Sequence, residues 1–179
     1  MKPKQKKCKV RGCKNTFTPY NSLQNVCSPA CAIILAKKDR KKKEKECRKQ
    51  TRAEKIALKT RGDWLKDLQK VFNLYIRLRD KNKPCISCQT YPKKSNAGHY
   101  LSVGARPELR FNEDNVHLQC EHCNSYLSGN QIEYRKNLIK KIGLEKVEWL
   151  EGPHELPRLT IDEIQEKLKH YRKKVREMK

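Results

Sequence analysis

Two stretches of the chain place apolar residues at helical spacing, one near the middle and one at the C-terminal end. In the first stretch the spacing predicts a helix over 63–83 with one face packed on a core. Asp63 is its expected N-cap, and Lys83-Pro84 is expected to end it. The apolar positions are Leu65, Leu68, Phe72, Tyr75 and Ile76.

The second apolar stripe follows Thr160-x-x-Glu163, a capping-box signature that predicts the start of a helix. We expect this basic, amphipathic helix to pack on the rest of the chain. Pairing with its own copy in a homodimer is the open alternative. The stripe consists of Ile161, Ile164, Leu168, Tyr171 and Val175.

Between these helices the pattern predicts two short strands and a further helix. Tyr100–Val103 and Val116–Leu118 carry β-branched and aromatic residues, and the segment that joins them contains Gly and Pro. The stretch 128–143 predicts a helix that ends at Gly143. The expected fold class is therefore α+β, with strand, loop, strand and helix in succession.

The segment 37–61 has too few apolar residues to pack on a core. It contains thirteen basic and four acidic residues and neither Gly nor Pro. This composition predicts either a long exposed helix or an arm that gains order on a nucleic-acid backbone. The residues expected to contact phosphates here are Lys37, Lys38, Arg40, Lys41, Lys42 and Lys43.

The net charge strengthens the expectation of a polyanionic partner. The chain has 43 Lys and Arg against 20 Asp and Glu, a formal charge of +23 on 179 residues. Nucleic acid is the expected partner, with affinity that falls steeply as salt rises. A solvated basic surface, as in a ribosome-associated or membrane-surface protein, is the plainer alternative. No apolar run approaches the roughly 20 residues of a membrane span, and the N-terminus lacks a secretory signal.

Eight of the nine cysteines occur in close pairs. A cytoplasmic, reducing location is expected, and paired cysteines there indicate metal ligands before disulfides or free thiols. Two sets of four thiolates predict two closed, structural Zn²⁺ sites. Such sites would stabilise a chain whose apolar content is only 36%. The sets are Cys8, Cys13, Cys27 and Cys31, and Cys85, Cys88, Cys120 and Cys123; the lone Cys47 is assigned no role.

The Cys85–Cys88 and Cys120–Cys123 pairs flank 31 residues, and this segment contains polar residues that could act in catalysis. His99 follows a glycine at a predicted strand end, and the pKa of an imidazole lies near neutrality. It is therefore our candidate general base for hydrolysing a phosphodiester. The alternative is that His99 and His117 are strand histidines bonded to the backbone, with Asn115 and Asn124 capping turns.

In their order along the chain these motifs resemble a known family. Gly98-His99 followed by DNxHxxCxxCN at 114–124 is similar to the HNH, or ββα-metal, nuclease pattern. AGHY at 97–100, LRFNEDN at 109–115, SGN at 128–130 and CSPAC at 27–31 resemble the NinG (Rap) recombination nucleases of lambdoid phages. The resemblance covers nearly the whole chain and is weakest in the basic arm and the C-terminal tail.

This resemblance implies a small zinc-stapled ββα (HNH-like) nuclease module with flanking helices. It implies an endonuclease that uses Mg²⁺ or Mn²⁺ to cut branched recombination intermediates such as D-loops and Holliday-type junctions. Asn115 matches the family residue whose amide tethers a loop and orients the base, and Asn124 matches the residue that contacts the catalytic metal. His117 is a candidate second ligand or phosphate contact, and Arg106 and Arg110 are candidate phosphate contacts.

The sequence departs from the pattern at two positions. Gly98 stands where most ββα-metal enzymes have an Asp or His ligand, and Asn96 stands where the closer family often has Asp. Asn96, Glu113 or Asp114 are the alternatives for completing the metal shell. This departure motivates two further hypotheses: a non-catalytic zinc-finger protein that binds DNA or RNA, and a scaffold acting through its basic helix.

The expected organisation has four parts. They are an N-terminal four-cysteine zinc finger at 1–36, a basic helical arm at 37–62, the nuclease module at 63–150 and a C-terminal amphipathic helix at 151–179. The expected partner is branched or junction DNA, with no membrane and no small-molecule substrate.

Overall fold

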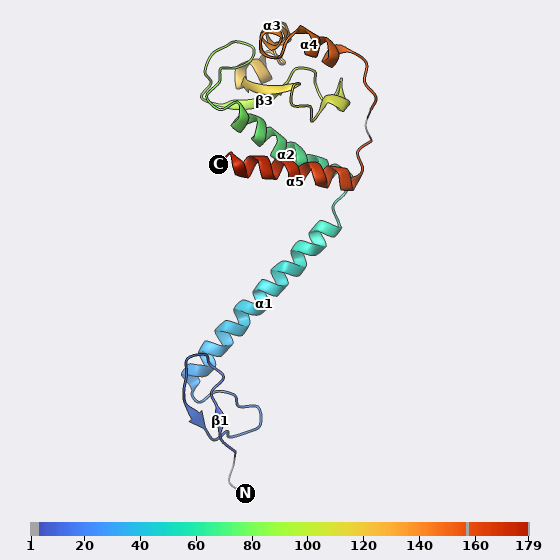
Figure 1. Cartoon of the computed structure of the whole chain (residues 1–179). Helices are drawn as coiled ribbons and strands as arrows, with labels where there is room; N and C mark the ends of the chain where they lie inside the picture. Colours follow the sequence, from blue (N-terminus) through green and yellow to red (C-terminus); the bar gives the residue numbers. More distant parts are fainter. Residues whose placement is uncertain (1–3, 157, 179) are drawn as a thin grey trace. The chain divides into compact units, whose positions relative to one another are not determined.

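The computed structural model describes residues 4–156 and 158–178, and the chain divides between Leu58 and Lys59 into two compact units (Figure 1). Each unit is built of helices and one two-stranded sheet, so the fold is α+β as expected. Across the described ranges, no helix is both long enough and apolar enough to cross a membrane.

The first unit combines a small cysteine-rich hairpin with one long helix. Strands β1 (Lys6–Lys7) and β2 (Thr16–Phe17) pair antiparallel. Helix α1 (Pro29–Ala57) begins where the Ser28 hydroxyl accepts a hydrogen bond from the Cys31 amide at 3.3 Å, with Pro29 in the first turn. None of its residues is buried. Of the two expectations for 37–61, the structure therefore has the exposed helix.

In the second unit, the first helix begins earlier than the sequence pattern suggested. Helix α2 (Arg61–Arg79) has Thr60 as its N-cap, and Asp63 is the third helical residue of a reciprocal capping box. The prediction of Asp63 as N-cap was thus wrong, because Gly62 continues the first turn instead of breaking it. The helix also ends before Lys83-Pro84, at Arg79.

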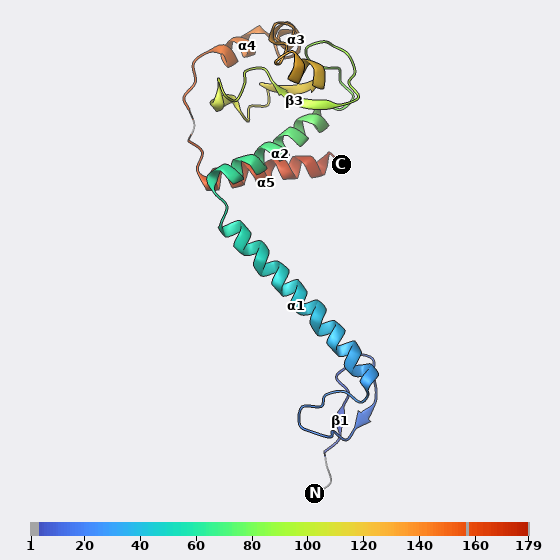
Figure 2. The same cartoon turned by 180° about the vertical axis from the view of Figure 1, so that it is seen from behind.

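Helix α5 (Ile161–Glu177) packs lengthwise on α2, and the two helices lie side by side in both views (Figures 1 and 2). Its predicted capping box, formed by Thr160 and Glu163, is present. The apolar stripes of both helices form one core, in which the Phe72 and Tyr171 rings meet edge to face at 4.9 Å. The apolar stripe of α5 is therefore buried within its own chain from Ile164 to Val175, while Ile161 at its start is 40% exposed.

The other face of α2 carries the hairpin of strands β3 (Ser95–His99) and β4 (Val116–Cys120). The strands are antiparallel, with Ser95 opposite Cys120 and His99 opposite Val116. The first strand thus precedes the predicted segment Tyr100–Val103. Its sequence, SNAGH, is small and polar and lacks the β-branched residues on which that prediction relied.

Helices α3 (Gln131–Ile142) and α4 (Leu144–Glu151) cover the hairpin on the side away from α2 (Figure 1). Gly143 ends α3 as predicted, with a φ of 90° that favours glycine. The second core lies here and joins both helices to the residues that follow β3. Its members are Ile86, Tyr100, Leu109, Tyr134, Leu138, Val147 and Leu150.

A buried ion pair at the C-terminal end of α2 fixes the position of β4. The Asp80 carboxylate is fully buried, pairs with the Arg79 guanidinium at 2.8 Å and accepts a bond from the Leu118 amide at 3.1 Å. Arg79 donates to the Val116 carbonyl at 2.8 Å. Burial alone would raise the pKa of Asp80, but the Arg79 guanidinium outweighs it and holds that pKa well below its ordinary value.

We expect Asp80→Asn to lower the free energy of unfolding of this unit by about 3–5 kcal/mol, because it leaves a partly buried guanidinium without its counter-charge. Urea unfolding followed by fluorescence measures this unit alone, since both tryptophans, Trp64 and Trp149, belong to it. Because the folded pKa is depressed, the Asp80 contribution is present above about pH 4 and declines as the pH falls toward the folded pKa. The difference between parent and variant should therefore shrink in acid.

Glu148→Gln, which removes an exposed carboxylate on α4, is the control. Equal losses of stability for both variants would contradict the role assigned to Asp80.

Candidate active site and metal centres

The second set of four cysteines closes the base of the β3–β4 hairpin. Cys120 ends β4, and Cys123 follows it in a single π-helical turn (His122–Tyr126). The Cys85–Cys88 knuckle is held against the strand by a hydrogen bond from the Ile86 amide to the Leu118 carbonyl at 3.0 Å. The four sulfur atoms lie within 4.8 Å of one another.

The first set joins the β1–β2 hairpin to the start of α1. Cys8, Cys13, Cys27 and Cys31 also place their sulfur atoms within 4.8 Å of one another. The Cys27 sulfur is 3.6 Å from that of Cys13 and 3.7 Å from that of Cys31. Within each of the two predicted sets, the fold therefore brings the four cysteine sulfur atoms together.

Both sets fit tetrahedral zinc. With Zn–S bonds of about 2.3 Å, the edges of a tetrahedron of sulfurs measure about 3.8 Å. The separation of the Cys88 and Cys120 sulfurs, 3.8 Å, matches this edge, and the Cys13–Cys27 and Cys27–Cys31 separations of the first set are within about 0.2 Å of it. All positions are filled by thiolates, so each site can hold a structural Zn²⁺ and leaves no open position for substrate.

His99 is half-buried at the last position of β3, beside the loop that joins the two strands. Its Nε2 lies 3.0 Å from the carbonyl oxygen of Arg110. A carbonyl only accepts, so Nε2 carries the proton and Nδ1 keeps its lone pair. Burial lowers the pKa of His99 below its ordinary value of 6.5, which favours the neutral imidazole at neutral pH.

Asn115 is fully buried and ties the loop to the strand end next to His99. Its Oδ1 accepts from the Leu101 amide at 2.9 Å, and its Nδ2 donates to the carbonyls of Leu101 at 3.0 Å and Leu109 at 3.2 Å. Leu109 immediately precedes Arg110, whose carbonyl bonds to His99. The Asn115 amide thus fixes the segment that orients the His99 ring.

Gly98 has no room for a side chain. A β-carbon at this position would lie 2.2 Å from Oε1 and 2.8 Å from Cβ of Gln119, which is fully buried on the same face of the hairpin. The Gln119 amide is held in place by bonds from Nε2 to the Ser87 hydroxyl at 2.7 Å and to the Gly129 carbonyl at 2.6 Å. The packing of Gln119 therefore leaves no space for an Asp or His side chain at position 98.

His117 lies on the opposite face of the hairpin from His99. In the antiparallel register it pairs with Gly98, whereas His99 pairs with Val116, and successive residues of a strand point to opposite faces. His117 is 2% exposed, and its Nδ1 is 3.3 Å from the Tyr134 hydroxyl. Burial lowers its pKa to about 3, so it is neutral. This placement favours the structural reading of His117 over a metal or phosphate contact.

The candidate donors for a catalytic cation are sparse. Asn124 is half-buried in the π-helical turn, and Asn96 lies in β3 opposite Gln119. Glu113 is engaged by the hydroxyl of Tyr75 at 2.6 Å and the ammonium of Lys174 at 2.7 Å, so its carboxylate serves the packing of α5. Among the described residues, the two cysteine sets are the only groups of three or more His, Cys, Asp or Glu suited to a metal.

The predicted phosphate contacts fall into two kinds. The six basic residues on α1 are exposed, and Arg40 and Lys42 make only surface pairs with Glu44 and Glu46. Arg106 instead pairs with Glu108 and donates to the carbonyls of Glu151 and Gly152, which gives it a structural role. Arg110 is half-buried and donates from Nε to Gln69 at 2.7 Å.

Sequence reasoning missed three residues that shape the site. Gln119 and Tyr134 fill the face of the hairpin behind Gly98, with the Tyr134 hydroxyl donating to the Gly98 carbonyl at 2.9 Å. Because residues two apart on a strand point to the same face, Gln119 lies beside His117, and this alternation along β4 could have indicated it from the sequence. The role of Asp80 depends on partners distant in the sequence, the Leu118 amide of β4 and Lys141 of α3, and its neighbours Arg79 and Lys83 alone did not indicate that it is buried.

Comparisons with known proteins give a consistent result. The family model described as Bacteriophage Lambda NinG protein matches residues 1–179. The chain is 39% identical to Protein ninG of Escherichia phage lambda, over 99% of this chain and 95% of that protein. It is 37% identical to Protein ninG of Salmonella phage P22, over 99% and 96%, and 40% identical to that of Enterobacteria phage H19B, over 90% and 88%. No solved structure gives a significant match.

The cysteine geometry predicts about two Zn²⁺ per chain by elemental analysis after purification under reducing conditions. Cys88→Ser should lower the content to about one, because it removes one thiolate from the second set. Cys47→Ser should keep both ions, since Cys47 is exposed and outside both sets. A parent protein without zinc would contradict the assignment.

The contact between Gly98 and Gln119 predicts that Gly98→Ala lowers stability by about 1–3 kcal/mol, the usual range for overpacking a buried site. Gly104→Ala is the matched control, because a β-carbon there meets nothing within 4 Å. Thermal unfolding of the two variants measures the difference. Equal melting temperatures would show that Gln119 moves aside without cost.

Proposed function

The chain belongs to the NinG family of bacteriophage proteins, and on that premise we propose that it is a metal-dependent endonuclease that cuts branched DNA. The observation that carries the proposal is the arrangement of His99. Its Nε2 is anchored on the Arg110 carbonyl at 3.0 Å, and Asn115 clamps the same loop at Leu109. This leaves Nδ1 as a free base on a half-buried, neutral imidazole.

In the proposed mechanism, His99 Nδ1 takes a proton from a water molecule. The oxygen of that water attacks the phosphorus and a new P–O bond forms, while the bond to the sugar oxygen breaks and that leaving oxygen takes a proton from solvent water. The Arg110 carbonyl stabilises the imidazolium that forms, because it accepts the Nε2 hydrogen in either protonation state. Asn115 is a positioning residue, since it acts through the loop and not on the reacting atoms.

A divalent cation such as Mg²⁺ or Mn²⁺ would neutralise charge that develops on the phosphate. Asn124 is the residue of this chain proposed to contact it. Mg²⁺ commonly keeps several waters and binds through few protein groups plus substrate phosphates, so a sparse donor set is compatible with it.

We infer that β3, β4, the π-helical turn and α3 together form the HNH-like ββα module. Zinc at the base of the hairpin would hold the two strands and the turn in register. The turn is separated from α3 by Ser128, Gly129 and Asn130, all at positive φ, so the helical part has two segments. The charge of +23 and the exposed basic face of α1 would supply affinity for the DNA backbone inside the host cell.

A second candidate function is a zinc-binding DNA or RNA module without catalysis. The observation that favours it is the sparse donor set, with position 98 closed by Gln119. A scaffold acting through α1 is supported only by the exposure of that helix.

His99→Ala should reduce cleavage of a synthetic four-way junction and a D-loop in Mg²⁺ by at least about a hundredfold, the usual contribution of a general base. Junction binding should be unchanged. The parent rate should fall as the pH drops below the ordinary imidazole value of 6.5, because the neutral ring is the active form and burial lowers its pKa. His170→Ala, an exposed histidine on α5, is the control.

The two candidate functions give different results in this assay. A parent protein that binds junctions but cuts none of them with Mg²⁺ or Mn²⁺ would establish the binding-module reading. A His99→Ala variant that cuts as fast as the parent would remove His99 from the mechanism.

A further inference from the structure

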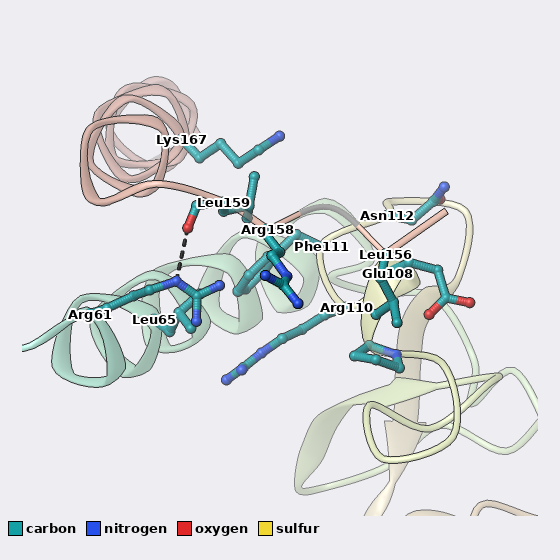
Figure 3. A pocket seen from close by; sticks show the side chains of 11 residues that line it. Arg61, Leu65, Glu108, Arg110, Phe111, Asn112, Leu156, Arg158, Leu159 and Lys167 are labelled. Atoms are coloured by element: carbon teal, nitrogen blue, oxygen red, sulfur yellow. Dashed lines mark hydrogen bonds between the residues drawn. The ribbon is translucent and has the colours of Figure 1, made fainter. Parts of the chain in front are cut away.

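The second unit contains a basic pocket that the proposed chemistry does not use. Its cavity is about 560 Å³, within the usual range of roughly 300–1,000 Å³ for small-ligand sites. It lies between α2, the loop that joins β3 to β4, and the segment that leads into α5 (Figure 3). These elements belong to one compact unit.

Four cationic side chains line this pocket, namely Arg61, Arg110, Arg158 and Lys167. None of them has a carboxylate oxygen within 4.0 Å in the described part of the chain. The one acidic lining residue, Glu108, is paired with Arg106. Figure 3 shows Arg61, Arg110 and Arg158 extending toward the same part of the pocket, while the Glu108 carboxylate points away.

Two of the arginines are held in position by the protein while part of each guanidinium stays free. Arg61 donates from Nε to the Leu159 carbonyl at 2.8 Å, and Arg110 donates from Nε to Gln69 at 2.7 Å. Both bonds use Nε alone, so the terminal nitrogens of each group can donate to an anion. Phosphate is one of the anions, with carboxylate, that guanidinium groups bind through paired hydrogen bonds.

Most of the remaining lining is apolar, with Asn112 as the polar exception. Leu65, Phe111 and Leu159 present part of their surface to the pocket while packing on the α2–α5 core, and Leu156 is 66% exposed at its edge. A phosphate on a double helix needs a basic surface but no apolar cavity, because its bases are stacked inside the duplex. A pocket with both guanidinium groups and apolar walls suits an unpaired nucleotide, which offers a phosphate and a free base.

We propose that this pocket binds an unpaired nucleotide of single-stranded DNA next to the scission site. The proposal rests on the proposed endonuclease function, and it names the feature of branched DNA that the chain selects. The connection to the candidate base is direct: the pocket residue Arg110 provides the carbonyl that bonds to His99 Nε2 at 3.0 Å. A strand held in the pocket would therefore lie beside the segment that orients His99.

The test compares two double variants of the full, zinc-loaded chain. Arg61→Gln/Arg158→Gln removes two pocket charges, and Lys169→Gln/Arg172→Gln removes two exposed charges of α5 outside the pocket. Fluorescence anisotropy without added Mg²⁺ measures the Kd for an oligothymidylate and for a linear duplex. The pocket variant should bind the oligothymidylate about tenfold more weakly than the control variant, with a shallower dependence on salt. The two variants should bind the duplex equally.

Arg158→Gln alone is a second variant, expected to leave the fold intact because Arg158 is exposed and its side chain makes no hydrogen bond with the described residues. It should weaken oligothymidylate binding about threefold. Photocrosslinking of an oligonucleotide with 5-iodouracil should label peptides that contain Phe111 or Leu156 in the parent, and this labelling should fall in the pocket variant.

The proposal is overturned if the pocket and control variants lose equal affinity for the oligothymidylate, or if the pocket variant loses as much for the duplex. These binding results are independent of cleavage. If the parent cuts no junction but the pocket variant still loses single-strand binding, the endonuclease proposal fails and the pocket stands. If junctions are cut and the pocket variant binds the oligothymidylate like the control, only the pocket proposal fails.

Discussion

The buried pair of Arg79 and Asp80 is the interaction on which the second unit depends. It joins the end of α2 to the main chain of β4 through the Val116 carbonyl and the Leu118 amide. Strand β4 begins directly after Asn115, which clamps the loop beside His99. It ends at Cys120, which belongs to a candidate zinc site. Removing two charges from water costs free energy, and their attraction alone need not offset it. Here the cost is also offset because each charged group makes a hydrogen bond to the backbone. The pair therefore fixes the strand that connects the candidate zinc site to the proposed base, His99.

The sequence was informative for several features whose determining interactions are local, although the local capping box at Thr60 was missed. Cysteine spacing, the apolar stripes of α2 and α5, and the Thr160 capping box each depend on residues a few positions apart, and each was predicted. The position of β3 could not be predicted, because SNAGH is a strand only through its pairing with β4. The pocket arginines Arg61 and Arg158 are far apart in the sequence and meet only because α5 packs on α2.

The candidate site combines a well-defined base with a weakly defined metal position. His99, Asn115 and the Arg110 carbonyl form a connected set of hydrogen bonds. Acidic residues that could have served as ligands are used elsewhere, as Glu113 is between Tyr75 and Lys174. In such a site, much of the charge stabilisation would come from bound water, substrate phosphates and nearby guanidinium groups. Because no cluster of acidic ligands marks the site, the composition indicated a nucleic-acid partner more clearly than any single motif indicated hydrolysis.

The packing of Gln119 over Gly98 also limits how this chain can evolve. An acidic side chain at position 98 would collide with the Gln119 side chain, and the collision extends to its β-carbon. Gln119 would first have to be replaced, and that step alone would remove its hydrogen bonds to the Ser87 hydroxyl and the Gly129 carbonyl, which would then keep only their long mutual contact of 3.5 Å. Each change by itself is costly, so selection acts on the two positions as a pair. An acidic residue before the histidine should therefore be accompanied by a different residue at position 119, so that the two positions change together in evolution.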